Sequence, residues 1–280
     1  MPSSPHHSST LLTVLPGDDV TSHIDTTAKR LKLGVGLQAS PDNRRITATL
    51  AGCLHSRNEH TWFVRTNSKR YHPTLDDRVL GIVEDRVGQE DGGDVYRVNI
   101  GGPHPAMLST LRFEGATKRN RPQFKPGILV YARIIRDGKT SGGGDPALSC
   151  LLGNHDAGVP RKDWMTDEAL YGQLKGGTMI KTSLGLAREL LDPNNVVLEE
   201  LATLPFEVAI GVNGFLWIHS KRPEYTIMIQ NAILNSEILT EAQTRGMVRK
   251  LMQTVRQQIE SQEMTDNGGG DNDDDSDMEE

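Results

Sequence analysis

Short apolar runs, separated by turns rich in glycine and proline, make up the chain as far as Gly153. Near the start these runs are brief and irregular, as at 31–37 and 46–50. From Val95 to Ile100 apolar and polar residues alternate, which is the period of a strand with one buried face. Further runs typical of strands occupy 79–83, 128–135 and 147–152, with a hairpin loop expected at 88–94. About five short strands curled by glycines predict a small barrel of the OB type.

Beyond Gly177 apolar residues recur at every third or fourth position instead. One helix is predicted by Tyr225, Met228, Ile229, Ala232 and Ile233. A second helix begins at Thr240, which forms a capping box with Gln243. Strand-like runs at 179–181, 206–210 and 215–219 come before them, and a short helix with Thr182 or Ser183 as its cap is expected after the first run.

These patterns predict a multidomain, β-rich protein with a small C-terminal α/β module. Between the barrel and this module the chain is polar and contains glycine, with Trp164 and Tyr171 as its large aromatic residues. The expected parts are a disordered start (1–10), a small all-β N-terminal domain (11–72), the OB-type barrel (73–153), a linker or insertion (154–176), the α/β module (177–262) and a disordered acidic tail (263–280).

Negative charge is concentrated at the C-terminal end. The formal net charge is −6, but residues 266–280 hold eight carboxylates and no Lys or Arg, so the rest of the chain carries +2. The part that folds is therefore mildly basic. Cys53 and Cys150 are the two cysteines, and they provide neither a disulfide framework nor a zinc site, which favours an intracellular protein. No apolar run approaches the ~18 residues of a membrane span, so we expect a soluble protein.

Positive charge is densest between residues 112 and 139, which contain eight Lys or Arg and only two Asp or Glu. Lys118, Arg119 and Arg121 form its centre, in a loop predicted between two barrel strands. Cations on such a loop can follow the phosphates of a single strand, whereas the plainer alternative is a solvated charged face. We interpret the loop as an RNA contact. The candidate RNA-binding residues are Lys118, Arg119, Arg121, Arg112, Lys125 and the smaller cluster of Lys69 and Arg70, which is either a hinge or a stacking site.

Catalytic motifs are missing from the sequence. Residues 138–140 resemble the end of a P-loop, but Arg133 stands where its first glycine is required. The chain has no Gly-x-Ser-x-Gly, no His-Glu-x-x-His and no paired acidic motif of the kind that holds two metals in a nuclease. We therefore expect no catalytic residues, no metal and no cofactor. The alternative of an exonuclease is disfavoured because the carboxylates that would hold its metal ions are missing.

The sequence Gly211-Val212-Asn213-Gly214 invites comparison with the Gly-x-x-Gly loop by which KH domains clamp a nucleic-acid backbone. That loop normally joins two helices and carries a basic residue, whereas this one joins two predicted strands. A tight turn with positive φ explains it without a ligand. We expect a structural role, in which Asn213 and Trp217 help to pack this domain against the barrel.

Several strings of residues together resemble the eukaryotic exosome cap subunits of the S1/KH type. These strings are Val14 to Asp18, Lys69 to Tyr71, Phe113 to Pro122, Leu184 to Leu186, and Gly211 to Gly214 followed by Trp217. The resemblance extends over nearly all of residues 11–255. The Phe113 to Pro122 string is similar to the Rrp40-like cap subunit rather than to its sister S1/KH cap protein.

This resemblance implies an N-terminal domain, an S1 barrel and a KH-type domain in a non-catalytic subunit. Such subunits sit on a ring of RNase PH-like subunits and guide single-stranded RNA 3′ ends into its channel, in the nucleus, nucleolus and cytoplasm, while a separate subunit hydrolyses the RNA. The stretch 160–171 looks longer than the family's usual crossing. A free-standing S1/KH RNA-binding regulator is the alternative. The structural or interface residues implied are Val14, Leu15, Pro16, Gly17, Gly211, Asn213, Gly214 and Trp217.

Overall fold

The computed structural model describes residues 12–24, 31–42, 44–57, 61–66, 70–138, 144–153, 156–166 and 168–267, with the backbone alone for 57, 260 and 262–267. The chain divides into two units, 1–69 and 70–280. The disordered start expected at 1–10 and the chain after Asn267 lie outside the described residues.

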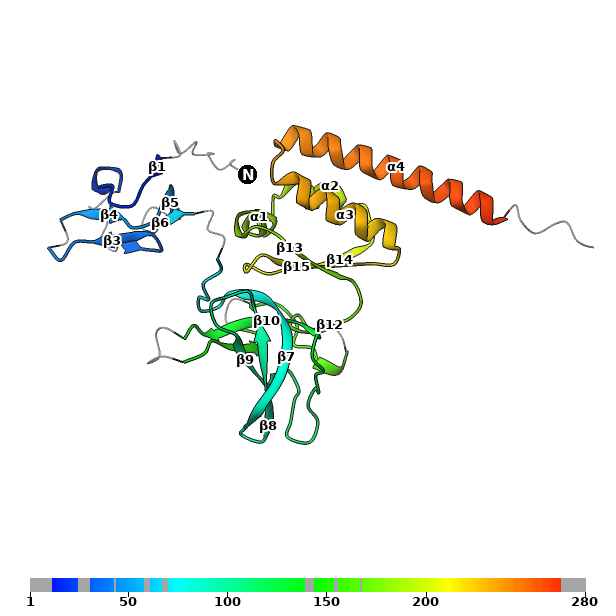
Figure 1. The fold of residues 1–280 in the computed structure, drawn as a ribbon, viewed down its shortest axis with the longest axis horizontal. Coiled ribbons are helices and arrows are strands. Elements are labelled where there is room, and N and C mark those ends of the chain that lie inside the picture. Colours follow the sequence, from blue (N-terminus) through cyan, green and yellow to red (C-terminus); the bar gives the residue numbers. More distant parts are fainter. Residues whose placement is uncertain are drawn as a thin grey trace, which may run out of the picture. The chain divides into compact units, whose positions relative to one another are not determined.

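Short strands build the described part of the first unit (Figure 1). They are β1 (Leu12–Val14), β2 (Lys32–Leu33), β3 (Leu37–Ala39), β4 (Ile46–Ala48), β5 (Gly52–Arg57) and β6 (Thr61–Arg65), with a 3-10 turn at Thr21–His23. One sheet has the order β1-β5-β6-β2, and β3 pairs with β4. Val14, Ile46 and Val64 belong to the small aliphatic core of this first unit. The predicted all-β N-terminal domain is confirmed.

Five strands close into a barrel in the second unit. They are β7 (Arg78–Glu90), β8 (Gly93–Asn99), β9 (Ala106–Phe113), β10 (Leu129–Arg136) and β11 (Ala147–Cys150). β11 pairs with β9 on one side and with β10 on the other, which turns the order β11-β9-β8-β7-β10 into a ring. The predicted OB-type barrel is confirmed.

The β7–β8 hairpin is longer than its apolar residues predict. Ladder pairing continues to Glu90 and Gly93, so the turn is only Asp91 and Gly92, and the loop expected at 88–94 is wrong. Side chains from Glu84 onward are exposed on β7, so they give no apolar signal. Gly81 lies inside the strand because a Cβ there would collide with Val98 on β8.

The described residues of 156–174, within the segment expected to be a linker or an insertion (154–176), pack on the barrel. The strand β12 (Gly172–Leu174) pairs with β10. The buried Tyr171 donates its hydroxyl to the buried carboxylate of Asp156, and Arg78 Nη2 donates to the same carboxylate at 2.7 Å. Tyr71, expected in the N-terminal domain, is buried in the barrel core, so the barrel begins earlier than residue 73.

The predicted α/β module contains a three-stranded sheet and four helices among its described residues. These elements are β13 (Thr178–Lys181), α1 (Leu184–Leu190), α2 (Val196–Leu201), β14 (Phe206–Ile210), β15 (Phe215–Ser220), α3 (Pro223–Ser236) and α4 (Glu241–Asn267), with sheet order β13-β15-β14. Ser183 caps α1 by accepting from the N–H of Leu186 at 3.0 Å. The side chain of Gln243 accepts from the N–H of Thr240 at 3.0 Å, as the capping box predicts.

The central strand β15 is buried on both faces. Phe215 and Trp217 belong to the hydrophobic cluster of the barrel, whereas Leu216 and Ile218 belong to the cluster of the helices. Because successive side chains of a strand point to opposite faces, the sheet is a middle layer between barrel and helices. The hydrophobic cluster of the barrel is therefore shared by both domains of the second unit, because residues of the α/β module complete it.

The helix α4 continues to Asn267, past the end expected for the module at residue 262. Figure 1 shows its C-terminal part projecting beyond α3. The tail that was expected to be disordered from residue 263 is therefore helical as far as Asn267, because the acidic composition begins only near the end of this helix.

Candidate functional site

The basic loop, residues 114–128, connects β9 to β10. β7, β8, β9 and β10 alternate in direction, so their connections lie alternately at the two ends of the barrel. The basic loop therefore lies at the same end as the β7–β8 turn. The 100–105 connection and the described ends of the 137–146 connection lie at the other end.

Asp94 anchors the basic loop to this hairpin. Its side chain is buried, forms an ion pair with Arg86 Nη2 at 2.7 Å and accepts from Arg121 Nε at 3.4 Å. The amide of Gln89 donates to it at 3.1 Å. Burial raises the pKa of the Asp94 carboxyl, but the Gln89 hydrogen bond and the two guanidinium groups outweigh burial and hold this pKa below its ordinary value.

The guanidinium of Arg121 is engaged within the protein. Its Nη1 donates to the backbone carbonyls of Gly92 at 2.9 Å and of Lys118 at 2.5 Å, in addition to the contact with Asp94. Lys118 and Arg119 instead have exposed side chains. Of the three cations at the centre of the predicted RNA contact, two face solvent and one holds the loop in shape.

The other predicted RNA-binding residues are not all brought to this loop. Arg112, at the end of β9, and Lys125, within the basic loop, are exposed. Arg70 is also exposed, but the chain after it lines a cavity at the far end of the barrel, away from the basic loop. Lys69 lies outside the described residues.

The first half of the basic loop is fixed to the 160–166 segment, which includes the 3-10 turn Trp164–Thr166. The carbonyl of Glu114 accepts from the N–H of Trp164 at 3.1 Å. Gly115 has φ +77, and a Cβ there would collide with the carboxylate of Asp163. The side-chain amide of Asn120 donates to Met165 Sδ at 3.1 Å. Sequence reasoning missed this contact, because neither periodicity nor charge pairs two loops so far apart in the chain.

The aromatic rings of the barrel are directed inward. Tyr96, Phe113, Phe124, Tyr131 and Tyr171 are each 8% exposed or less. Within the described barrel, no exposed pair of aromatic faces therefore accompanies the basic loop. The chemistry available there is cationic, and it suits phosphate groups more than stacked bases.

The Gly211 to Gly214 turn is a contact between the two domains. The side-chain amide of Asn213 donates to the carbonyls of Leu80 at 2.7 Å and Ile100 at 2.8 Å, and its oxygen accepts from the N–H of Leu80 at 3.3 Å. The buried Trp217 donates Nε1 to the carbonyl of Gly176 at 2.8 Å. This turn is directed into the barrel, so it is closed to a nucleic-acid backbone.

The connection between α1 and α2, residues 191–195, has no Gly-x-x-Gly sequence and no basic residue. Asp192 is its only charged residue. Asn195 caps α2 by accepting from the N–H groups of Val197 and Leu198, both at 3.1 Å. The helix pair therefore lacks the phosphate-binding chemistry by which KH domains hold a backbone.

The Val14 to Gly17 stretch forms an exposed turn in the first unit. Val14 is buried, but Leu15 is 60% exposed. Asp18 closes the turn by accepting from the N–H of Leu15 at 2.8 Å, and Gly17 donates to the carbonyl of Ala48 at 2.7 Å. The chain thus presents an aliphatic side chain at the tip of a fixed turn.

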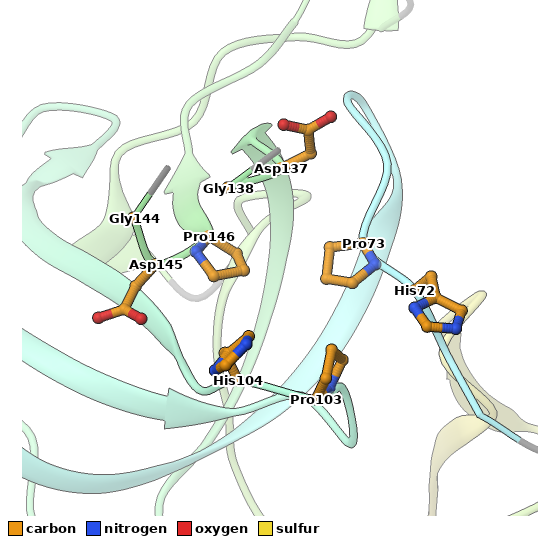
Figure 2. A pocket seen from close by; sticks show the side chains of 9 residues that line it. All are labelled: His72, Pro73, Pro103, His104, Asp137, Gly138, Gly144, Asp145 and Pro146. Carbon is orange, nitrogen blue, oxygen red and sulfur yellow. The ribbon is translucent and has the colours of Figure 1, made fainter. Parts of the chain in front are cut away.

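A cavity of about 440 Å³ lies at the end of the barrel away from the basic loop. Figure 2 shows the rings of Pro73, Pro103, His104 and Pro146 around it. It is lined by His72, Pro73, Pro103, His104, Asp137, Gly138, Gly144, Asp145 and Pro146.

In the part of the chain that the structure describes, no group of three His, Cys, Asp or Glu residues could hold a metal ion. None of the described helices is both long and apolar enough to span a membrane.

A five-stranded barrel sharing a core with a three-stranded α/β module defines a protein of the S1/KH class. Residues 71–158 match the family model described as "Exosome complex component RRP40, S1 domain", and 177–224 match a KH domain model.

Relatives named exosome complex component RRP40 extend the similarity to most of the chain. That of Schizosaccharomyces pombe is 32% identical over 84% of this chain and 94% of its own length. The Drosophila melanogaster protein is 36% identical over 81% of this chain and 89% of its own length. The Homo sapiens protein is 32% identical over 80% of this chain and 77% of its own length. The chain belongs to the RRP40 family of exosome complex components, which confirms the resemblance stated from the sequence.

Proposed function

We propose that the chain is a non-catalytic, RNA-binding cap subunit of the RNA exosome. It docks on a ring of RNase PH-like subunits beside other cap subunits. It guides 3′ ends of single-stranded RNA into the channel for processing and degradation by a separate catalytic subunit, in the nucleus, nucleolus and cytoplasm. Family membership supports the assembly, and one observation carries the RNA contact: Lys118 and Arg119 are exposed on a loop that Arg121 and Asp94 hold in place.

Within this function, the exposed cations Lys118, Arg119, Arg112 and Lys125 contact phosphates. Arg121 acts as a positioning residue, because its donors are used on the loop and hairpin. Lys69 and Arg70 contact RNA at a place apart from the basic loop, because the chain that follows Arg70 lies at the far end of the barrel. The KH-type domain supports the barrel through Asn213 and Trp217 instead of clamping RNA.

The exposed turn at Val14 to Gly17 docks the N-terminal domain on the ring. Three exposed aliphatic residues support this role: Leu15 (60% exposed), Val35 (68%) and Leu50 (40%). The chain at Ala48 and Thr49 hydrogen-bonds both to the first turn and to Gly36. The three side chains therefore lie on neighbouring turns, where they form an apolar surface suited to a protein partner.

Fluorescence anisotropy with a 5′-fluorescein-labelled 12-nucleotide polyuridylate tests RNA binding. If three to five phosphates are neutralised, log K against log salt concentration has a slope of roughly −2 to −3.5. The double variant Lys118→Ala/Arg119→Ala lowers the magnitude of this slope by about 1.4. Lys250→Ala/Arg256→Ala, which removes two exposed cations from α4, is the matched control. Affinity independent of salt, or equal slopes for both double variants, would contradict the basic-loop assignment.

Co-purification with ring subunits separates the cap subunit from a free-standing S1/KH regulator. We expect the chain to elute with the ring in size-exclusion chromatography, and Leu15→Asp to weaken that association without changing the thermal stability. A chain that never joins the ring would favour the regulator. Incubation with end-labelled RNA and Mg²⁺ tests an exonuclease, and we expect no shortening of the RNA.

A further inference from the structure

The 160–166 segment carries an exposed cation and an exposed thioether beside the basic loop. Contacts from Trp164 to Glu114 and from Asn120 to Met165 hold it there, both at 3.1 Å. Met165 is nevertheless 60% exposed. A large apolar side chain that is both fixed and open to solvent is available to a ligand.

The carboxylates in and next to this segment have partners within the protein, although Asp163 is itself exposed. Asp163 Oδ1 accepts from the N–H of Met165 at 2.9 Å, and its other oxygen faces Gly115. Lys162 forms an ion pair with Glu168. Arg161 remains as an exposed cation. The segment therefore adds an exposed guanidinium, that of Arg161, and an exposed thioether, that of Met165, to the surface beside the basic loop.

We propose that the 160–166 segment is a second RNA-contact element, in which Arg161 binds a phosphate and Met165 packs against a base. This inference rests on the proposed function of the basic loop and extends it. A strand of RNA that leaves the loop presents alternating phosphates and base faces. The aromatic rings of the barrel are buried, so a base beside the loop meets Met165, whose polarizable thioether adapts to aromatic surfaces.

Three single variants of the full chain test the two contacts with the same labelled polyuridylate. Arg161→Ala reduces the slope of log K against log salt by about 0.7, which corresponds to about fivefold weaker binding at 0.1 M salt. Met165→Ala weakens binding about threefold and leaves the slope unchanged, because no charge is lost. Met165→Trp tightens binding about threefold, because an indole offers a larger stacking face.

Two exposed residues elsewhere provide matched controls. Arg256→Ala removes a cation from α4, and Ile238→Ala removes an apolar side chain that is 85% exposed. Neither control is expected to change affinity or slope. Thermal melting of each variant shows whether the segment has kept its fold, and Met165→Trp keeps the test decisive if Met165→Ala loosens the segment.

The outcomes separate this inference from the function on which it rests. If Lys118→Ala/Arg119→Ala weakens binding while the Arg161 and Met165 variants bind like the original chain, the second contact element is refuted and the basic loop stands. If the double variant also binds normally, or the chain does not bind at low salt, the proposed RNA contact itself fails. Weaker binding by both Ala variants together with tighter binding by Met165→Trp supports the inference.

Discussion

Replacing Asn213 by alanine tests how the two domains of the second unit are joined. This side chain is 4% exposed and makes three hydrogen bonds to barrel backbone, at 2.7, 2.8 and 3.3 Å. The variant removes all three and leaves the carbonyls of Leu80 and Ile100 without this donor. The turn is also held on the barrel by a bond from the N–H of Val212 to the carbonyl of Arg78 at 2.9 Å, which the variant keeps.

The expected loss follows from the number of bonds. A hydrogen bond contributes about 1 kcal/mol net, and leaving a buried partner unsatisfied costs about 1–3 kcal/mol. Three bonds therefore predict a loss of about 3 kcal/mol in the free energy of unfolding. A domain typically has about 5–15 kcal/mol in total, so the variant should still fold.

Urea unfolding at 25 °C, followed by tryptophan fluorescence, measures this loss. The three tryptophans report on different places: Trp62 in the first unit, Trp164 beside the barrel and Trp217 at the domain junction. Asn194→Ala, at an exposed position between α1 and α2, is the control and should cost less than about 0.5 kcal/mol. If Asn213→Ala cost no more than this control, the junction would not depend on these bonds.

Asn213→Asp sharpens the test through pH. A carboxylate at this position faces the carbonyls of Leu80 and Ile100, so Asn213→Asp should be less stable than Asn213→Ala at pH 7. Protonation restores one donor, so the folded-state pKa of this carboxyl lies above its unfolded value. The native state then binds more protons than the unfolded state, and the deficit shrinks as pH falls toward 4. A deficit that grew with acid would refute the reasoning.

Further changes test the loops around the basic site. Asp94→Ala should lower the free energy of unfolding in urea by about 2 kcal/mol, because it leaves Arg121 without its buried carboxylate partner. Because the pKa of Asp94 is lower in the folded than in the unfolded chain, its stabilising effect is complete above the unfolded-state pKa and is lost as the pH falls through the folded-state pKa. Gly115→Ala, at φ +77, should cost more than 1 kcal/mol and speed tryptic cleavage in the 160–166 segment, and unchanged cleavage would contradict the contact. Tyr171→Phe should cost about 1 kcal/mol by removing its bond to Asp156, measured in the same way.

The elements with regular apolar spacing could be predicted from the sequence. The strand from Val95 to Ile100, the two strands around Gly211 to Gly214 and the capping box at Thr240 all occur where their patterns place them. In each case the information is local, because one buried face or one cap fixes the conformation. The exposed half of β7 has no such face, so its pairing was missed.

The geometry of the candidate site depended on contacts that no local pattern contains. Charge density predicted a basic loop, but it could not distinguish Arg121, whose donors are used on Asp94 and backbone, from Lys118 and Arg119. A buried carboxylate far away in the sequence makes that difference. The structural role of Asn213 could be anticipated, because the turn joins strands instead of helices, but its partners on the barrel could not.

Burial of β15 on both faces affects how this family can exchange its parts. A fragment ending before residue 177 would leave the barrel without the cover of Phe215 and Trp217, and the isolated KH-type domain would expose the same rings. Borders drawn from domain similarity therefore cut through one cooperative folding unit. We expect a transplanted KH-type domain to be tolerated only together with the barrel surface that matches it.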